Sequence, residues 1–307
     1  MFRMFNIPNL FTAANMLCGF FSIILALFGR IDLAPLFILA AMVFDFLDGF
    51  IARKMNLQGE LGKQLDSLAD MVTFGIAPGI IMLVMIVIGI DFSALLAKES
   101  GTNFQNTELS YFAFIQIWDW IQALIYGAPT ELSYYAFIQI WDWIQALIYG
   151  VPNDFDASIK YLPFIALIIP FFAMFRLAKF NIDKRQSERF RGVPTPLNTI
   201  FFLFFPLYFS VNLNQWEHQE KWILMLFDCY TLSAITVLFS VLMVTDIPLI
   251  SLKFKTWTWN ENKFRYILVG SSLIIIPLFW IWAILIIVFL YLFLSLIENY
   301  QLKKYEV

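Results

Sequence analysis

Long apolar runs dominate this chain and restrict the folds that it can adopt. A run of about 20 apolar residues is long enough to cross a bilayer as a helix. Six runs near this length precede residue 245, at 10–28, 34–53, 66–90, 159–178, 197–211 and 222–244. The composition agrees, because 61% of the residues are hydrophobic and 19% aromatic, far from the average of soluble proteins. The sequence therefore predicts an all-α polytopic membrane protein.

A seventh apolar run, at 266–297, is long for one helix and short for two full ones. It contains Pro277, and Lys303 and Lys304 follow it. These lysines return to the side that carries most of the other basic residues only if the run crosses the membrane twice. We therefore expect a C-terminal hydrophobic hairpin, and about eight membrane-spanning helices in all.

Spans and connectors divide this one membrane domain into four consecutive parts. The parts are the N-terminal segment with spans one to three (1–90), an insertion outside the cytoplasm (91–158), spans four to six with a basic connector (159–252), and the C-terminal hairpin and tail (253–307).

The insertion contains a tandem repeat. The segment ELSYFAFIQIWDWIQALIYG at 108–127 recurs at 131–150, with Tyr135 in place of Phe112 as the one difference. Each copy is amphipathic, is shorter than a span and carries a central Asp. We expect a helix on the membrane surface, produced by duplication within a tolerant loop and without a chemical role.

Four aspartates lie close together in the sequence, next to strongly apolar segments. Asp45 and Asp48 are three residues apart, so they project from one face of their helix. Asp66 and Asp70, four apart, do the same on the next helix. The polar connector 55–63 can return the chain as an antiparallel hairpin, which lets the two acidic faces meet. Because acidic groups at membrane depth are costly without a compensating partner, the pattern indicates a functional site.

The donor types in this stretch favour a hard divalent cation. Clustered carboxylates without a nearby Cys or His suit Mg²⁺ or Mn²⁺, and substrate phosphates often complete such a site. Small residues at 49, 52, 59 and 62 leave room for a phosphate ligand, and Arg53 adds a forked positive charge. The alternative interpretation, helix caps or surface pairs, fits Asp66 alone but does not account for all four aspartates.

Eight fixed residues of this stretch form the pattern Asp45-x2-Asp48-Gly49-x2-Ala52-Arg53-x8-Gly62-x3-Asp66-x3-Asp70. At every fixed position the pattern resembles the motif of the CDP-alcohol phosphatidyltransferases. The resemblance implies that family's six-helix core and a homodimer. It also implies that Asp45, Asp48 and Asp66 ligate divalent metal, and that Asp70 acts as general base and can also ligate. The resemblance further implies that the CDP-lipid site is lined by Gly49, Ala52, Arg53 and Gly62.

Polar residues at the start of the first span share one helix face, because Asn9, Thr12 and Asn15 are spaced by three. Helix capping and hydrogen bonds between helices explain them without a ligand. In the alternative interpretation they border the nucleotide site, and Asn9 and Thr12 are then candidates for contacts with the CDP-lipid.

A basic connector follows the fourth span, with the sequence RLAKFNIDKRQSERFRGVPTP at 176–196. Basic residues beside a membrane commonly set the orientation of the chain against anionic lipid. This stretch also resembles the RLARFN and GLP-P element of the bacterial-type phosphatidylserine synthases within the family, with Lys179 in place of Arg. The resemblance implies serine as acceptor, and the candidates for binding it are Arg176, Lys179, Asn181 and Arg191.

Basic residues are distributed unevenly between the two sides of the predicted topology. Sixteen of the 20 Lys and Arg fall on the side of the aspartates, which the positive-inside rule assigns to the cytoplasm. Both termini and the candidate site would then lie at the cytoplasmic face of the inner membrane. A net charge of −3 gives no indication of nucleic-acid binding.

Together the two motifs predict metal-dependent transfer of the phosphatidyl group from CDP-diacylglycerol to L-serine, with release of CMP. The same chemistry with glycerol 3-phosphate or inositol phosphate stays open, because the basic connector could also hold a phosphate. The alternative from another class is a divalent-cation transporter. It would need acidic residues near mid-membrane, whereas these lie at one end of their spans.

Overall fold

The computed structural model describes residues 6–57, 59–99, 131–149, 159–182, 190–212, 219–250 and 258–305. Its α-helices are α1 (Ile7–Leu27), α2 (Ala34–Lys54), α3 (Glu60–Asp70), α4 (Ala77–Glu99), α6 (Glu131–Tyr149), α7 (Ile168–Ile182), α8 (Thr195–Asn212), α9 (Lys221–Phe227), α10 (Cys229–Val244), α11 (Trp259–Phe279) and α12 (Trp282–Tyr305). A π-helical turn, η1 (Met71–Ile76), joins α3 to α4, and a 3-10 helix, η2 (Ile159–Leu167), precedes α7. Two short strands, β1 (Phe190–Arg191) and β2 (Pro248–Leu249), pair antiparallel.

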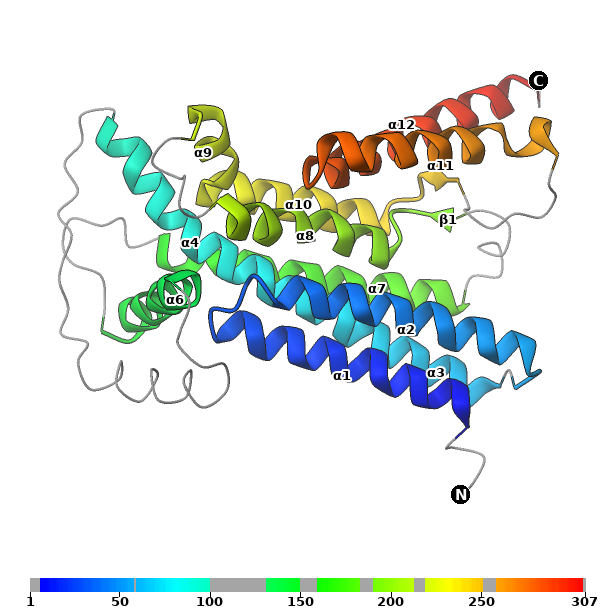
Figure 1. Cartoon of the computed structure of the whole chain (residues 1–307), viewed down its shortest axis with the longest axis horizontal. Helices are drawn as coiled ribbons and strands as arrows, with labels where there is room; N and C mark the ends of the chain where they lie inside the picture. The colour runs from blue at the N-terminus through cyan, green and yellow to red at the C-terminus, as the bar shows by residue number, and fades with distance from the viewer. Residues whose placement is uncertain are drawn as a thin grey trace.

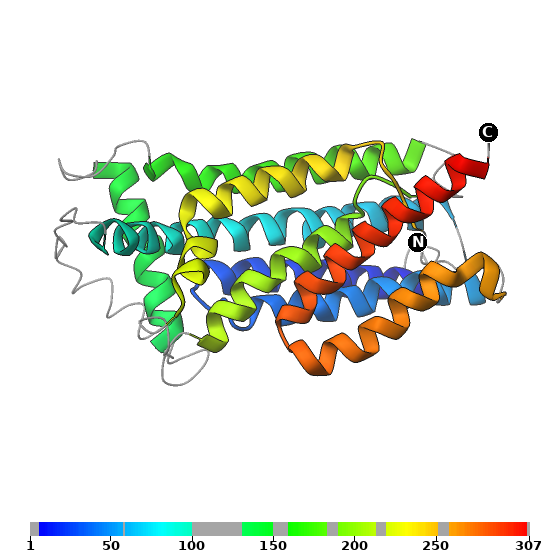
Figure 2. The same ribbon diagram turned by 90° about the horizontal axis from the view of Figure 1, so that it is seen from above.

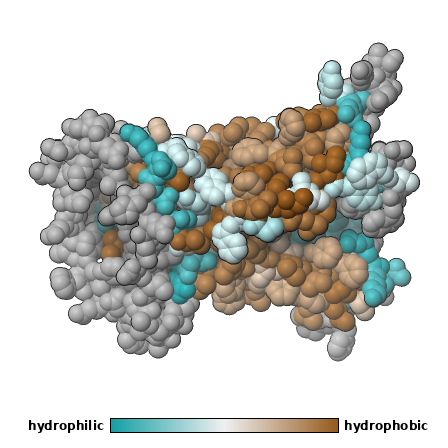
Figure 3. Space-filling view, turned by 45° about the horizontal axis from the view of Figure 1, so that its top comes forward, coloured by the Kyte–Doolittle hydropathy of each residue, from teal (hydrophilic) through white to brown (hydrophobic). Residues whose placement is uncertain are grey.

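The long helices run side by side along the longest axis of the molecule (Figure 1). Six helical segments of the described residues are long and apolar enough to cross a membrane, or seven if the bent pair α9 and α10 is one span. In Figure 3, hydrophobic side chains cover the middle of the displayed face, with hydrophilic residues towards both ends. The prediction of an all-α polytopic membrane protein is confirmed.

The expected fifth span, α8, is a helix but is not among these candidate spans. Two prolines and two asparagines lower its apolar character. Its phenylalanines are almost completely buried, at positions Phe201, Phe202, Phe204, Phe205 and Phe209. α8 packs against α12, α4 and η1 within the bundle.

The C-terminal apolar run forms the expected hairpin, because α11 and α12 pack against each other and both qualify as spans. The chain reverses at Trp280, where φ is +51°, three residues after Pro277. α12 also packs along α8 and β2, so the hairpin contacts the rest of the bundle.

The second copy of the repeat forms α6, which lies across one end of the bundle rather than along it (Figures 1 and 2). The α6 helix contacts α4 and η2. Its Trp143 Nε1 donates to the Lys160 carbonyl at 2.7 Å, and the Trp143 and Phe164 ring centroids are 5.2 Å apart. The first copy, at 108–127, lies outside the described residues, and the surface position of the repeat stays a prediction.

The starts of α1 and α3 and the end of α2 lie at the opposite end of the bundle from α6 (Figure 1). Asn6 caps α1 by accepting a hydrogen bond from the backbone N–H of Asn9. Further along α1, a Cβ on Gly19 would lie 2.6 Å from Thr73 Oγ1, so only a glycine lets α1 approach η1 this closely. This close packing fixes the first helix against the segment that carries the second pair of aspartates.

Candidate functional site

Three of the four aspartates meet between the last third of α2 and the middle of α3. Oxygens of Asp45, Asp48 and Asp66 lie within 4.8 Å of one another. The Asp45 carboxyl is within hydrogen-bonding reach of both Asp66 and Asp70. We call these four residues the aspartate site. The α2–α3 hairpin therefore brings the acidic faces of its two helices together.

The first helix supports the aspartate site with two side chains. Thr12 Oγ1 donates to Asp48 Oδ2 at 2.6 Å, and both residues are 5% exposed. Asn15 Nδ2 donates to Asp70 Oδ1 at 3.5 Å, and Thr73 Oγ1 donates to the Asn15 carbonyl at 3.2 Å. Thr12 is thus placed beside a carboxylate as well as near the expected nucleotide site.

Asn15 was not among the candidates drawn from the sequence. Its spacing of three from Thr12 was the signal that could have included it. The Asn15 side chain is fully buried, and its Oδ1 has no hydrogen-bond partner among the described residues. A buried amide oxygen without a donor is costly, which makes this atom a contact point for a ligand or an ordered water.

The residues of the aspartate site fit a hard divalent cation. All of their donor atoms are carboxylate oxygens, and three residues are close enough to share one ion. Within the described part of the chain, none of the four forms an ion pair with a Lys or Arg. Clustered carboxylates without a cationic partner repel one another, so a bound cation would stabilise this arrangement. Asp45, Asp48 and Asp66 are the residues that would hold it, and Mg²⁺ and Mn²⁺ both accept such ligands.

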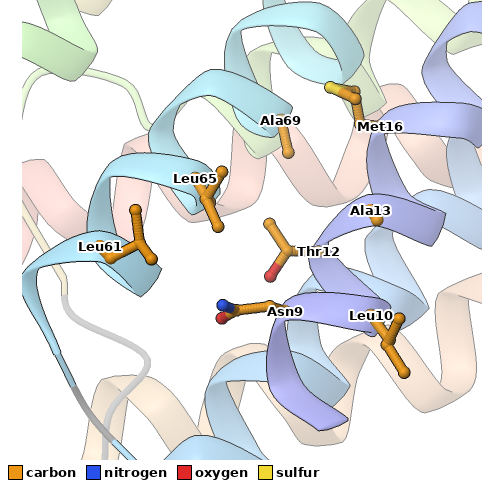
Figure 4. Close-up of a pocket in the computed structure, with 8 residues that line it drawn as sticks. All are labelled: Asn9, Leu10, Thr12, Ala13, Met16, Leu61, Leu65 and Ala69. Carbon is orange, nitrogen blue, oxygen red and sulfur yellow. The ribbon is translucent and has the colours of Figure 1, made fainter. Parts of the chain in front are cut away.

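A cavity of about 280 Å³ lies beside the aspartate site, between α1 and α3. Its wall is mostly apolar, and Asn9 and Thr12 are the polar residues that line it (Figure 4). Thr12 links the two features, because its hydroxyl donates to Asp48. A Cβ on Gly62 would lie 3.5 Å from Asn9 Oδ1, so these two expected CDP-lipid contacts face each other. An apolar cavity next to carboxylates suits an amphiphilic ligand.

The other expected CDP-lipid residues lie on the last two turns of α2. Gly49 and Ala52 are partly buried, and Arg53 is exposed. A Cβ on Gly49 would lie 3.4 Å from Arg53 Nη1, so the guanidinium folds back over the glycine. Arg53 and Gly49 therefore lie against each other at ordinary contact distance.

The four expected acceptor contacts lie on α7 and β1. Asn181 Nδ2 donates to Ser67 Oγ at 2.8 Å, and Lys63 Nζ donates to the Asn181 carbonyl at 3.3 Å. Both partners of Asn181 belong to α3, and Ser67 follows Asp66 directly. The end of α7 is therefore fastened beside the aspartate site.

The other three expected acceptor contacts, Arg176, Lys179 and Arg191, differ in how neighbouring residues hold them. Arg176 is 3% exposed and donates to the carbonyls of Val193 (3.4 Å) and Gly192 (3.5 Å). Lys179 Nζ forms an ion pair with Asp246 Oδ1 at 2.7 Å. Arg191 lies in β1, opposite Pro248 of β2, and is partly exposed. The structure thus gives Arg176 a role in holding the turn after β1.

Comparison with known proteins shows that part of this chain is similar to one family. Residues 5–138 match the sequence model described as CDP-alcohol phosphatidyltransferase. The chain is 45% identical over 75 residues to the CDP-diacylglycerol–serine O-phosphatidyltransferase of Bacillus subtilis, covering 24% of this chain and 42% of that protein. It is 39% identical over 79 residues to the archaetidylserine synthase of Methanothermobacter thermautotrophicus (25% and 34%).

A third relative is eukaryotic. The chain is 42% identical over 88 residues to the CDP-diacylglycerol–serine O-phosphatidyltransferase of Saccharomyces cerevisiae, covering 26% of this chain and 32% of that protein. The matched segments thus span less than half the length of these relatives. The match at 5–138 includes α1 to α4 and all four aspartates. The clustered aspartates therefore lie in the part of the chain that matches the CDP-alcohol phosphatidyltransferase family.

Proposed function

We propose that the protein transfers the phosphatidyl group from CDP-diacylglycerol to the hydroxyl of L-serine and releases CMP. The convergence of Asp45, Asp48 and Asp66 within 4.8 Å, next to Asp70, is the observation that carries this proposal. Serine as acceptor is supported by the relatives, because the names of all three include serine or archaetidylserine. The apolar cavity between α1 and α3 supports a lipid-linked donor.

In this proposal the donor binds with its cytidine diphosphate at the aspartate site and its acyl chains in the apolar surroundings. Asn9, Thr12, Gly49, Ala52, Arg53 and Gly62 line the CDP-lipid site. Asp45, Asp48 and Asp66, with Asp70 as a possible fourth ligand, hold Mg²⁺ or Mn²⁺. A divalent cation bound there would supply Lewis-acid chemistry, which neutralises charge on the diphosphate and on the departing CMP.

Asp70 is proposed as the general base. It takes the proton of the serine hydroxyl as the serine oxygen forms a bond to the phosphorus next to diacylglycerol. The bond between that phosphorus and the CMP oxygen breaks in the same displacement, and CMP leaves. In this proposal, Asn15 holds one oxygen of Asp70 by its amide N–H and so orients the carboxylate towards the acceptor hydroxyl.

The basic residues beside the aspartate site are proposed to bind the acceptor. Arg191 and Lys179 would hold the serine carboxylate, and Asn181 would position them through its contacts with α3. Arg176, which is buried, is proposed to contribute indirectly, by holding the turn at Gly192 and Val193. The proposal also places the site and both termini at the cytoplasmic face of the inner membrane, and the protein in a homodimer, as the family resemblance implies.

CMP release by the purified protein in detergent tests this function. The protein is supplied with CDP-diacylglycerol and, in parallel, with L-serine, glycerol 3-phosphate or inositol phosphate, each with and without a chelator of divalent cations. We expect release only with serine and only with the divalent cation present. Release with glycerol 3-phosphate alone would transfer the proposal to that acceptor.

A transport assay distinguishes the proposed enzyme from the alternative function, a divalent-cation transporter. Asp45 and Asp48 lie in the second half of α2, and Asp66 and Asp70 lie in the first half of the helical stretch Glu60–Ile90, which favours a site away from the middle of these spans. We therefore expect no Mn²⁺ uptake into liposomes that contain the protein. Uptake that depends on Asp45 and Asp48, together with an absence of CMP release, would favour the transporter.

A further inference from the structure

Residues 248–250, which follow α10, are fastened to α12 by three side chains. Tyr291, Ser295 and Asn299 are each four residues apart, so they lie on one face of α12. The Tyr291 hydroxyl donates to the Ile250 carbonyl at 2.8 Å, and Ser295 Oγ accepts from the Ile250 N–H at 3.2 Å. Asn299 Nδ2 donates to the Pro248 carbonyl. We call these three residues the α12 brace.

Two members of the α12 brace are deeply buried. Tyr291 is 4% exposed and Ser295 is fully buried, as is Ile250 at 1%. Hydrogen bonds to backbone groups in such surroundings cannot be replaced by water, so losing one leaves a backbone group unsatisfied. The brace therefore fixes the position of β2 more firmly than its two-residue pairing with β1 would do alone.

The segment held by the α12 brace in turn holds the turn after β1. The backbone N–H of Gly192 donates to the Ile247 carbonyl at 2.8 Å, and that of Val193 donates to the Leu242 carbonyl at 3.1 Å. Gly192 has φ +75°, and a Cβ there would lie 2.7 Å from the Thr245 carbonyl, so only glycine fits. The carbonyls of Gly192 and Val193 then accept from Arg176.

A continuous chain of contacts thus leads from the C-terminal hairpin to Arg176 and Arg191. We propose that the α12 brace positions the turn at 190–193, which carries Arg191 and is held by Arg176, for binding an acceptor carboxylate. Tyr291, Ser295 and Asn299 are positioning residues in this role, since their hydrogen bonds go to the backbone of 248–250, and Tyr291 also lies close to Arg176. This inference rests on the proposed function. It assigns to the C-terminal hairpin, which lies outside the matched residues 5–138, a part in acceptor binding.

Removing the three polar groups tests the brace in two independent ways. The triple variant Tyr291→Phe, Ser295→Ala and Asn299→Ala is compared with Ser271→Ala and Tyr300→Phe. Ser271 donates only within α11 in the described contacts, and Tyr300 is 75% exposed. Tyr291→Phe alone keeps the ring and serves if the triple variant does not fold.

The first measurement is amide hydrogen exchange of the full chain in detergent, which needs no substrate. We expect exchange at Gly192, whose amide bonds to Ile247 next to β2, to be about tenfold faster in the triple variant and unchanged in the controls. Unchanged exchange at this amide would overturn the inference, whatever reaction the protein catalyses.

The second measurement is the KM for each substrate, from CMP release. We expect the KM for serine to rise about tenfold, with the KM for CDP-diacylglycerol unchanged within about twofold. Equal changes in both KM values would show a general structural defect and overturn the positioning role. If the wild-type protein releases no CMP with serine, the proposed function fails, while the exchange measurement still decides whether the brace holds the turn.

Discussion

The aspartate site and the basic residues of α7 and β1 lie at the same end of the molecule, but they are stabilised in different ways. Arg176 and Lys179 find their partners within the chain, as backbone carbonyls and Asp246. In the described part of the chain, the aspartates receive hydrogen bonds from Thr12 and Asn15 but no ion pair. The acidic side is therefore organised for a cation from solution, whereas the basic side is largely complete without one.

The contrast indicates where a ligand would contribute most to the stability of the site. A cation would relieve the repulsion among carboxylates that the fold forces together. Arg176 and Lys179 have less to gain, because other residues of the chain already supply partners for them. Substitutions on the acidic side should therefore have larger effects than substitutions on the basic side, and the following experiments measure that order.

The largest effect is expected at the proposed base. Asp70→Asn should lower the rate of CMP release by about 10²–10⁴-fold, the range typical of a lost general acid or base. Binding of CDP-diacylglycerol, measured by equilibrium dialysis or calorimetry, should persist because the three carboxylates at 45, 48 and 66 stay in place. Wild-type turnover in this variant would remove Asp70 from the role.

The second effect concerns the cation itself. Asp66→Asn removes one of the three converging carboxylates. The Mg²⁺ or Mn²⁺ concentration for half-maximal CMP release should therefore rise more than about 100-fold, which exceeds the effect of losing a residue that only supports a metal ligand. Direct Mn²⁺ binding, followed by electron paramagnetic resonance, should weaken in parallel. An unchanged cation requirement would place the ion elsewhere.

A smaller effect is expected from the hydroxyl that orients Asp48. Thr12→Val removes the 2.6 Å hydrogen bond and should weaken Mn²⁺ binding by about 10–100-fold, as for other groups that hold a ligand in place. Thr236→Val is a matched control, because Thr236 is fully buried and its hydroxyl has no hydrogen-bond partner in the described structure. Equal weakening in both variants would contradict an orienting role for Thr12.

The smallest effect is expected on the basic side. Lys179→Gln and Asp246→Asn each break one exposed ion pair, so each should change the free energy of unfolding by less than about 1 kcal/mol. If Lys179 also binds the acceptor, only Lys179→Gln raises the KM for serine, by about fivefold. The same increase in Asp246→Asn would show that the ion pair, and not the lysine, matters for serine.

Sequence spacing predicted the acidic part of the molecule better than the basic part. The aspartates are three and four residues apart on two helices joined by a short connector, so local geometry already directs both pairs to one place. The basic candidates were chosen by charge and resemblance, and their partners lie far along the chain. Lys179 bonds Asp246, 67 residues away, which no local pattern contains.

The fold shows the same contrast between features that local sequence patterns predict and features that depend on long-range contacts. Apolar length predicted the long helices and the C-terminal hairpin, because a span needs about 20 apolar residues wherever it packs. It did not predict that α8 is almost wholly buried, nor that the hairpin is fastened to β2. Both depend on which helices become neighbours.

The sequence by itself therefore determined a helical membrane protein with four acidic residues on two facing helix surfaces, since helical periodicity and bilayer thickness act over a few turns of chain. Only the tertiary structure decided which side chains hold those residues in place. Thr12 reaches Asp48 across 36 positions, Asn15 reaches Asp70 across 55, and Tyr291 reaches Ile250 across 41. Such contacts are fixed by the packing of whole helices against one another, and each requires a close approach that local spacing does not encode.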